Sequence, residues 1–456
     1  MPDAQTIYAL SSGHPPAAIA VVRMSGPHAR FALETMIGRV PEPRKAVLAQ
    51  VRDPHTGETI DEALALWFPG PKSETGEDMA ELQLHGGRAV IAGVMAALGR
   101  LVEMRPAEPG EFTRRAFENG RLDLTAVEGL ADLISAETEV QRRQAFRQLK
   151  GLLGDRAESW RKRLIAALAL VEARIDFSDE ADVPEALVAP ALEVAKALHD
   201  ESVAALAGAA RGERLREGLV VAIAGPPNAG KSTLLNRIAR REAAIVSAVP
   251  GTTRDVIEVH LDLNGYPVTV LDTAGIRESD DPVEREGVVR ARARAGEADL
   301  VLWVVDASES ELLNGSQTLE RTSGQEIWLV RNKVDLNSQK TLEKYINERE
   351  YLFSFISNLS ALTGEGVNEL MNIVYDYSRR YFGMGEAALV TRARQRKALE
   401  EAASALGRAC LEGPLGREDI IAEELRLASR ALGRLTGRVD VEDILDVIFR
   451  DFCIGK

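Results

Sequence analysis

The segment Gly225–Ser232 (GPPNAGKS) constrains the fold of this chain more than any other stretch, because it fits the pattern G-x-x-x-x-G-K-[ST]. The apolar run 219–224 before it predicts a buried strand, and residues 234–238 after it predict the start of a helix. A loop between such a strand and helix can cradle phosphate, because its N–H groups and the helix dipole attract negative charge. Lys231 would reach the outer phosphates, and the Ser232 hydroxyl can ligate Mg²⁺. A lone match can be an accidental glycine loop, so downstream motifs have to decide.

Four further motifs follow in the order that a guanine-nucleotide domain requires. They are Gly251-Thr252-Thr253-Arg254, Asp272-Thr273-Ala274-Gly275, Asn332-Lys333-Val334-Asp335 and Ser360-Ala361-Leu362. A threonine hydroxyl of the first can ligate Mg²⁺ and sense the γ-phosphate. In the second, Asp272 can hold the metal's water shell and the Gly275 N–H can meet the γ-phosphate. Five motifs in order within one α/β span predict GTP binding.

Guanine selectivity is expected from Asp335, whose carboxylate can accept hydrogen bonds from the ring N–H and the exocyclic amine of guanine. Adenine lacks that amine and would leave a buried carboxylate unpaired, which discriminates by roughly 10⁴-fold or more. A backbone N–H of the segment 360–362 would close the base pocket on the guanine oxygen.

Two positions depart from a Ras-like domain. Ile276 stands where Ras-type proteins place a water-orienting glutamine, so another residue has to take that role. The acidic run offers candidates: Glu278, Asp280, Asp281, Glu284 and Glu286. Asn228 lies within the phosphate loop, where its carbonyl oxygen suits a weakly held monovalent cation. The alternative is that Asn228 is simply a turn residue.

Composition describes an ordinary globular protein. The chain has 456 residues, of which 45% are hydrophobic and 28% charged, and this length predicts about two or three domains. No apolar run approaches a membrane span, no signal peptide is evident, and two cysteines, Cys410 and Cys453, favour a reducing compartment, the cytoplasm. The net charge of −14 argues against a general nucleic-acid coat, although local basic patches can still bind phosphate.

The residue pattern divides the chain into four segments. It predicts the fold class of an α/β P-loop GTPase domain that is inserted into an α-helical domain and preceded by a small α+β N-terminal domain. The segments are 1–120 (α+β, with strands near 19–22, 63–67 and 79–84), 121–216 (helical), 217–380 (Ras-like) and 381–456 (helical). In the first helical segment, Thr125 to Glu128 has the form of a capping box that starts one long helix to about Leu149. The basic stripe Arg142, Arg143, Arg147 and Lys150 is either a solvated face or an RNA contact.

Over essentially its full length the chain resembles the bacterial tRNA-modification GTPase family called MnmE or TrmE; the span 306–352 resembles it least. The pieces that carry the resemblance are Ala20–Gly26 (AVVRMSG), Ala65–Pro71 (ALWFPGP), Leu82–Gly87 (LQLHGG), Pro109–Thr113 (PGEFT), Gly251–Asp255 (GTTRD) and the terminal Phe452–Lys456 (FCIGK). The terminal pentapeptide is highly specific.

The resemblance implies a homodimer joined through the N-terminal domain, which binds a formyl- or methylene-tetrahydrofolate type of one-carbon carrier. Arg23, Glu81, Arg121 and Lys456 match the family's folate contacts. With an FAD-dependent partner, MnmG, such proteins form a heterotetramer that modifies C5 of the wobble uridine of certain tRNAs. Cys453 invites a nucleophile role, but a thiol needs activation that a sequence cannot show.

The resemblance also implies that K⁺ and the pairing of two nucleotide domains stimulate hydrolysis. Glu284 matches the family's catalytic glutamate, beside Lys231 and Thr253. Mg²⁺ would be held by Ser232 and Thr253, and K⁺ by Asn228, Ser247, Val249 and Thr252. The motifs and the resemblance together predict these nucleotide-binding residues: Asn228, Ala229, Gly230, Lys231, Ser232, Thr233, Ser247, Ala248, Val249, Pro250, Gly251, Thr252, Thr253, Asp272, Thr273, Ala274, Gly275, Asn332, Lys333, Asp335, Ser360, Ala361 and Leu362.

Two hypotheses of different classes follow. The first is a GTPase that drives a tRNA-modifying complex; the alternative is an Era-like regulatory GTPase of ribosome assembly. The nucleotide motifs fit both, whereas the folate-type N-terminal domain and the terminal Cys453 segment favour the first.

Overall fold

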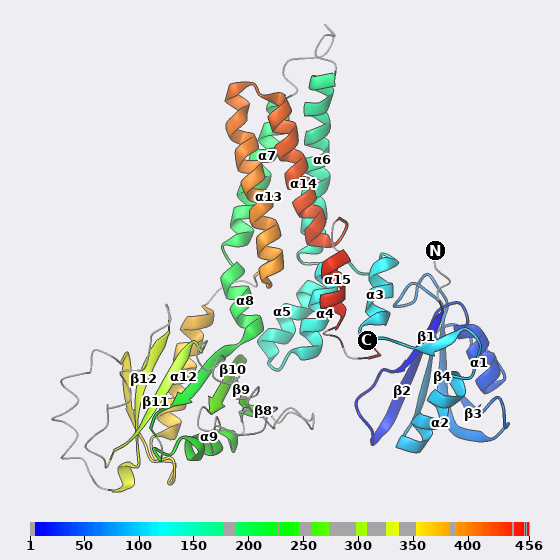
Figure 1. Ribbon diagram of the computed structural model, residues 1–456, viewed down its shortest axis with the longest axis horizontal. Coiled ribbons are helices and arrows are strands. Elements are labelled where there is room, and N and C mark those ends of the chain that lie inside the picture. Colours follow the sequence, from blue (N-terminus) through cyan, green and yellow to red (C-terminus); the bar gives the residue numbers. More distant parts are fainter. Residues whose placement is uncertain are drawn as a thin grey trace, which may run out of the picture. The chain divides into compact units, whose positions relative to one another are not determined.

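The computed structural model describes residues 5–176, 188–226, 228–241, 243–245, 258–272, 298–307, 325–336, 353–383, 388–439, 442–450, 452 and 454–455. The chain divides into two compact units (Figure 1). One unit consists of Met1–Ile134, Phe146–Val203 and Lys397–Lys456, and the other of Ser135–Ala145 and Ala204–Arg396.

The N-terminal α+β part of the first unit is a six-stranded sheet in the order β3-β4-β5-β2-β1-β6. Its elements are β1 (Thr6–Leu10), β2 (Ala17–Ser25), α1 (Ala29–Ile37), β3 (Val47–Arg52), β4 (Thr59–Phe68), β5 (Met79–Gly86), α2 (Arg88–Leu98), β6 (Met104–Pro106) and α3 (Glu111–Glu118). Strand residues alternate, so that Ala63, Ala65 and Trp67 of β4 are buried in one core with residues of α1 and α2. The three strands expected from the sequence lie within β2, β4 and β5.

Helices make up the rest of the first unit, and some of them continue into or lie within the second unit. They are α4 (Leu124–Ser135), α5 (Glu139–Leu149), α6 (Gly154–Asp176), α7 (Val188–Leu206), α8 (Ala209–Glu217), α13 (Ala393–Glu412), the 3₁₀ turn η6 (Gly413–Leu415), α14 (Glu418–Thr436) and α15 (Glu442–Arg450). Helix α14 packs along α6, and Gly407 of α13 lies against His199 of α7 (Figure 1). The first helical segment and the tail thus build one bundle.

The expected single helix from Thr125 to Leu149 is wrong, because the structure has two helices, α4 and α5, separated by residues 136–138. The break has a sequence signal in Thr138 and Gln141: the Gln141 Oε1 accepts the Thr138 N–H at 3.2 Å, and the Gln141 N–H donates to Thr138 Oγ1 at 3.4 Å. This reciprocal pair is a capping box that starts a new helix. The capping role expected of Thr125 belongs to Asp123, whose Oδ1 accepts the N–H of Ala126 at 2.9 Å.

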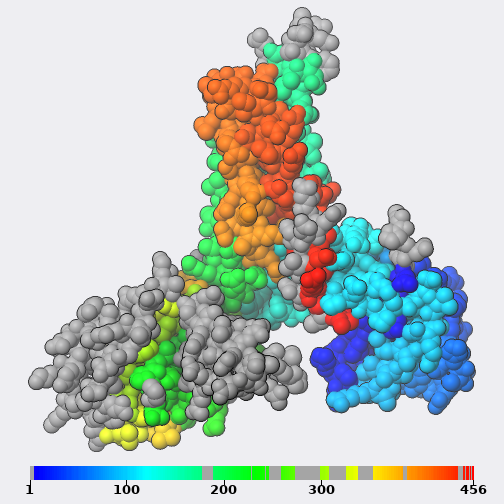
Figure 2. All heavy atoms as spheres, viewed as in Figure 1, coloured from blue at the N-terminus to red at the C-terminus, as the bar shows by residue number. Residues whose placement is uncertain are grey.

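The C-terminal residues of the chain pack on the N-terminal domain. Ile454 forms a β-bridge with Pro109, Phe452 is buried, and the Arg114 guanidinium lies 5.1 Å from the ring centre of Phe449. In Figure 2 the red atoms of this segment lie against cyan atoms of the N-terminal half. A chain end that ordinary fraying would release is therefore held in place.

The second unit contains a seven-stranded sheet in the order β13-β12-β11-β7-β10-β9-β8. Its elements are β7 (Leu219–Ala224), α9 (Lys231–Ala239), β8 (Ala244–Ile245), β9 (Glu258–Leu263), β10 (Tyr266–Asp272), β11 (Leu300–Asp306), β12 (Glu326–Asn332), the 3₁₀ turn η4 (Val334–Leu336), β13 (Phe355–Asn358) and α12 (Val367–Phe382). The strands β10, β7, β11, β12 and β13 are parallel, and β9 and β8 add an antiparallel edge.

The strand order reverses at β7, since the chain runs from β7 to β10 on one side and from β11 to β13 on the other. Ligands of such sheets bind beyond the carboxyl ends of the strands at this switch point. Because Gly225 follows β7 directly, the phosphate loop lies there. The architecture confirms the predicted fold class: a small α+β domain, then helices into which an α/β P-loop domain is inserted.

Candidate guanine-nucleotide site

The phosphate loop turns back on the neighbouring strand β11. Gly225 has φ +138°, and a Cβ atom there would lie 2.0 Å from the carbonyl oxygen of Val304, so only glycine fits. The Lys231 ammonium donates to the carbonyl oxygens of Gly225 at 2.9 Å and Pro226 at 2.8 Å. Lys231 is thereby held against the backbone of the loop in which the sequence predicts phosphate binding.

Lys231 is buried, and its burial affects the pKa of the ammonium. Burial lowers the pKa of the Lys231 ammonium, and the negative charge of Asp272 acts in the opposite direction. Phosphate oxygens would add to the effect of Asp272, because nearby negative charge favours the protonated form.

Two loop residues adopt left-handed backbone conformations. Asn228 has φ +59°, and Gly230 has φ +91°. A Cβ atom on Gly230 would lie 2.2 Å from Nδ2 of Asn332, so the absence of a side chain at Gly230 leaves room for the side-chain amide of Asn332. Asn228 is exposed, which fits both the cation and the turn interpretation.

Ser232 and Asp272 lie together although they come from different elements. The Ser232 hydroxyl at the start of α9 donates to Oδ2 of Asp272, at the end of β10, over 2.7 Å. Asp272 is only 1% exposed. A hydroxyl beside a buried carboxylate is an oxygen donor set that suits Mg²⁺, which is usually held by one or two protein groups plus substrate phosphates. The described residues include no cluster of three or more His, Cys, Asp or Glu that would bind a metal without a nucleotide.

Asn332 joins the phosphate side of the site to the base side. Its Nδ2 donates to the Ala229 carbonyl at 2.8 Å, and its Oδ1 accepts the Ala361 N–H at 2.8 Å. The segment 360–362 is a tight turn in which Ser360 is fully buried and its hydroxyl accepts the Thr363 N–H at 3.1 Å. The expected base-binding segments, 332–335 and 360–362, are therefore adjacent in space.

Lys333 and Asp335 complete this side. The Lys333 ammonium pairs with the buried Asp306 carboxylate at 2.5 Å, and Lys333 has φ +66°. Asp335 lies in η4 and is exposed, as a residue must be if it is to meet a base. The role of Asp306 was missed in the sequence, because an aspartate at a strand end has no motif that links it to Lys333.

A second residue that the sequence motifs missed is Arg237 on α9. Its Nε donates to the Ala361 carbonyl at 3.1 Å, and a terminal nitrogen donates to the Leu362 carbonyl. A hollow of about 250 Å³ opens here, lined by Thr233, Asn236, Arg237, Arg240, Ala361 and Leu362. Of the expected nucleotide contacts, Thr233, Ala361 and Leu362 thus border this hollow.

Several expected residues lie outside the part of the chain that the structure describes. They are Ser247, Ala248, Val249, Pro250, Gly251, Thr252, Thr253, Thr273, Ala274, Gly275 and Glu284, and in the tail Cys453 and Lys456.

Of the expected folate contacts, Arg23 and Glu81 lie side by side on neighbouring strands β2 and β5. The Arg23 guanidinium donates to Glu81 Oε1 at 3.0 Å and pairs with Glu74 at 2.9 Å. Arg121 is exposed and packs against Gly76. The loop that holds Glu74 and Gly76 therefore lies between Arg23 and Arg121.

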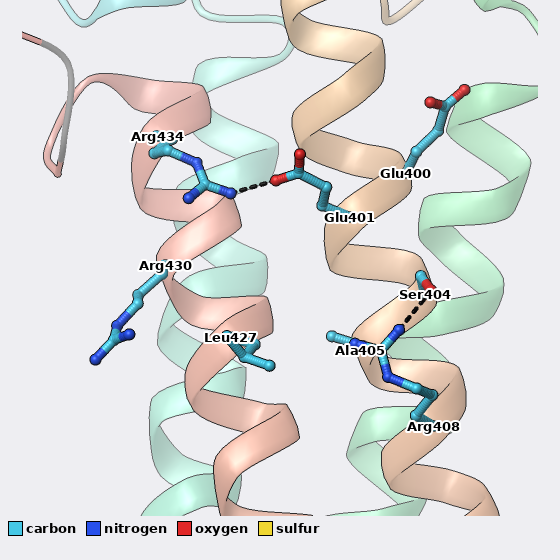
Figure 3. Close-up of a pocket in the computed structure, with 8 residues that line it drawn as sticks. All are labelled: Glu400, Glu401, Ser404, Ala405, Arg408, Leu427, Arg430 and Arg434. Atoms are coloured by element: carbon cyan, nitrogen blue, oxygen red, sulfur yellow. Dashed lines mark hydrogen bonds and ion pairs between the residues drawn. The ribbon is translucent and has the colours of Figure 1, made fainter.

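A larger hollow of about 510 Å³ lies between α13 and α14, lined by Glu400, Glu401, Ser404, Ala405, Arg408, Leu427, Arg430 and Arg434 (Figure 3). Its arginines do not form a free cationic site. Arg434 pairs with Glu401, Arg408 pairs with Glu424, and Arg430 points away from α13. In the basic stripe of α5, Arg142 and Arg143 likewise both pair with Glu139. Glu139 thus offsets one of the four positive charges of the stripe.

No helix in the described ranges is both long and apolar enough to cross a membrane.

Among known proteins, the family described as MnmE helical domain matches residues 124–453, and the family described as GTP-binding protein TrmE N-terminus matches residues 6–121. A protein named tRNA modification GTPase MnmE from Bradyrhizobium sp. (strain ORS 278) is 57% identical over 455 residues, covering 100% of both chains. A protein of that name from Rhodopseudomonas palustris (strain BisB18) is 58% identical, and the match covers 99% of both chains. A third, from Azorhizobium caulinodans, is 54% identical, and the match covers 100% of this chain and 99% of the relative.

Proposed function

This chain belongs to the MnmE family of tRNA modification GTPases, and from this membership we propose that its GTP hydrolysis drives the modification of C5 of the wobble uridine in certain tRNAs. The GTPase assignment rests in the structure on two hydrogen bonds of 2.8 Å, through which Asn332 joins the phosphate loop to the turn 360–362. The match of residues 6–121 to the TrmE N-terminus favours this function over that of an Era-like switch in ribosome assembly.

In this proposal the residues of the site divide the work on GTP. Lys231 and the loop N–H groups hold the phosphates, and Asp335 reads the guanine. Ser232 would ligate Mg²⁺, and Asp272 would hold its water shell; a bound Mg²⁺ supplies positive charge that stabilises the phosphates during transfer. The 2.7 Å contact between Ser232 and Asp272 supports their assignment to one metal site.

Hydrolysis itself needs a group that orients water, because Ile276 cannot do so. We assign that role to Glu284, with Thr253 as a further Mg²⁺ ligand. Asn228, Ser247, Val249 and Thr252 would bind K⁺ when two nucleotide domains pair. The charge of K⁺ would stabilise the negative charge that develops at the phosphates. Electrostatic stabilisation of this kind is the largest single contribution to catalysis in many active sites.

The one-carbon unit would come from a tetrahydrofolate derivative bound by the N-terminal domain of a homodimer. Arg23, Arg121 and Lys456 are cations that suit the carboxylates of a folate, and Glu81 suits the amidine-like edge of its pterin. The 3.0 Å contact between Arg23 and Glu81 supports their assignment to one site. The remaining partner would be an FAD-dependent MnmG in a heterotetramer, with the reaction in the cytoplasm.

The proposal is tested in a bacterium that lacks its own MnmE. Expression of this chain should restore the C5 modification of wobble uridine, measured by mass spectrometry of tRNA nucleosides. The Lys231→Ala variant should lose both GTP hydrolysis and restoration, since the lysine holds the transferred phosphate. Full restoration by a variant without GTP hydrolysis would contradict the proposed coupling, and no restoration by the wild type would contradict the proposed reaction.

A further inference from the structure

Arg237 ties the turn 360–362 to the helix that carries the phosphate loop. It lies on α9, and its planar guanidinium donates to the carbonyl oxygens of two successive residues, Ala361 and Leu362. Arginine suits this arrangement because its donors form a rigid fork, which a lysine ammonium does not. Arg237 is half-buried, so water competes only in part for the two carbonyls.

The same turn is held from its other side by Asn332, which accepts the Ala361 N–H. Ala361 is 2% exposed, whereas Leu362 is 72% exposed. Asn332 therefore fixes the inner part of the turn. The exposed part at Leu362 is held to α9 by Arg237.

The turn does not need Arg237 to form. It is closed internally by the Gly364 N–H, which donates to the Ser360 carbonyl at 2.8 Å, and by the Ser360 N–H, which donates to the Glu365 carbonyl at 2.9 Å. A Cβ atom on Gly364 would lie 3.5 Å from Cζ of Arg237, so the guanidinium packs directly over the turn. Arg237 therefore sets where the turn lies relative to α9, not its internal shape.

We propose that Arg237 is a positioning residue for guanine: it holds the base-binding turn at a fixed distance from the phosphate-binding start of α9. This inference rests on the GTP binding of the proposed function. A nucleotide has to reach both places at once, so a turn free to move away from α9 would bind its base less tightly and release it sooner. Phosphate binding, which uses the other end of α9, would not change.

The chain offers a matched control in Arg240, three residues after Arg237 and at the C-cap of α9. Arg240 lines the same hollow and is exposed, and its side chain forms no hydrogen bond or ion pair within the described part of the chain. The variants Arg237→Ala and Arg240→Ala thus remove the same charge from the same surface. Only the first removes the two contacts to the turn.

The experiment measures the release rate of a fluorescent GDP, kcat and KM for GTP, and the inhibition constant of inorganic triphosphate, which has no base. Arg237→Ala should speed GDP release and raise KM by roughly 10-fold to 100-fold, the effect of losing hydrogen bonds to a charged group. The kcat at saturating GTP and the inhibition constant of triphosphate should stay unchanged. Arg237→Lys should fall between the wild type and Arg237→Ala, and Arg240→Ala should match the wild type.

Three results would overturn the inference. Unchanged GDP release in Arg237→Ala would show that Asn332 suffices to hold the turn. Equal weakening of triphosphate binding would point to damage of α9 itself. An equal effect of Arg240→Ala would assign the change to surface charge. Failure of the proposed GTP binding would be seen separately, in the wild-type protein.

Discussion

The Ser232 hydroxyl and the Asp272 carboxylate form a hydrogen bond of 2.7 Å although 40 residues separate them in the sequence. Parallel pairing of β10 with β7 explains the contact, since Asp272 lies in register with Ile223, just before the phosphate loop. The last residue of β10 therefore reaches the first turn of α9. Two residues from separate motifs become one candidate Mg²⁺ site.

The variant Asp272→Asn tests this site. An amide still occupies the space, but it lacks the charge that would hold the water shell of the metal. We expect the Mg²⁺ concentration for half-maximal GTP hydrolysis to rise by about 10-fold to 100-fold. Losses of this size are typical when a residue that hydrogen-bonds to a metal ligand is replaced. The exposed Asp376 on α12 provides the control Asp376→Asn, which should leave Mg²⁺ dependence unchanged. The same Mg²⁺ dependence in both variants would contradict the assignment.

The variant Asp335→Asn tests guanine recognition. Xanthine carries a carbonyl where guanine has an amine, and an amide can donate to it whereas a carboxylate cannot. We expect GTP affinity to fall and XTP affinity to rise, a reversal on the order of 10⁴-fold in preference. Competition of GTP and XTP for a fluorescent nucleotide measures it. Unchanged GTP affinity would show that Asp335 does not read the base.

Local sequence patterns predicted much of this site, and distant contacts did not follow from them. The phosphate loop and the strand before it could be predicted because Gly225–Ser232 and the run 219–224 are contiguous. Arg237 could not, because its acceptors are backbone carbonyls, which every residue has, in a turn 124 residues away. The same holds for Asp306, whose partner Lys333 is reached through strand pairing of β11 with β12.

Two features of the helical part could have been predicted and were not. The capping box of Thr138 and Gln141 fits the S/T-x-x-E/Q pattern, but the continuous apolar period around it suggested an unbroken helix. Glu139 lies three and four residues before Arg142 and Arg143, which is the spacing of ion pairs on one helix face. The basic stripe was therefore partly neutral from the start.

The variant Arg23→Ala tests the folate site. Loss of the guanidinium should weaken binding of a reduced folate, measured by calorimetry, and leave GTP affinity intact, because the two ligands use different units. The control is Glu74→Gln: Glu74 also pairs with Arg23 but is half exposed, so removing its charge should not weaken folate binding. Equal loss of folate and GTP binding by Arg23→Ala would indicate misfolding. Unchanged folate binding would remove Arg23 from the site.

The variant Glu111→Gln tests a buried ion cluster behind β1. Glu111 pairs with Arg105 at 2.5 Å and with Arg115 at 3.0 Å, and Arg115 also donates to the Gln5 carbonyl at 2.9 Å. Arg115 keeps its ion pair with Glu77 at 3.0 Å, but it loses the charge-assisted contact to residue 111, so we expect the free energy of unfolding to fall by about 1.5–3 kcal/mol. Hydrogen exchange of β1 amides measures the change. The exposed Glu139 offers the control Glu139→Gln, which should have little effect.

The same cluster predicts a pH dependence. Burial acts to raise the pKa of Glu111, but the bonds from Arg105, the Glu108 N–H and Arg115 outweigh it and hold this pKa below its ordinary value of 4.5. A lowered pKa means that the charged form stabilises the folded state above about pH 4.5, and that this contribution is lost as pH falls further. The wild type should therefore lose β1 protection below that pH more steeply than Glu111→Gln. Parallel pH profiles would contradict the role of Glu111.

Asn228 allows a test of the proposed K⁺ site, because substitutions can distinguish the effect of its side-chain oxygen from the effect of its backbone conformation. At φ +59° the backbone is left-handed, a conformation that glycine adopts as readily as asparagine. The variant Asn228→Gly therefore removes the side-chain oxygen without straining the loop. We expect GDP affinity to stay unchanged and the stimulation of GTP hydrolysis by KCl over NaCl to disappear, because one ligand of the weakly held cation is lost.

Asn228→Ala completes the comparison, since alanine removes the same oxygen but is strained at a positive φ. If the oxygen alone matters, both variants lose the stimulation by K⁺ and only Asn228→Ala also binds GDP less tightly. If the asparagine is a turn residue, Asn228→Gly keeps the full stimulation and Asn228→Ala is impaired in both salts. Equal rates of the wild type in KCl and NaCl would remove K⁺ from the mechanism, and charge stabilisation would then have to come from protein groups.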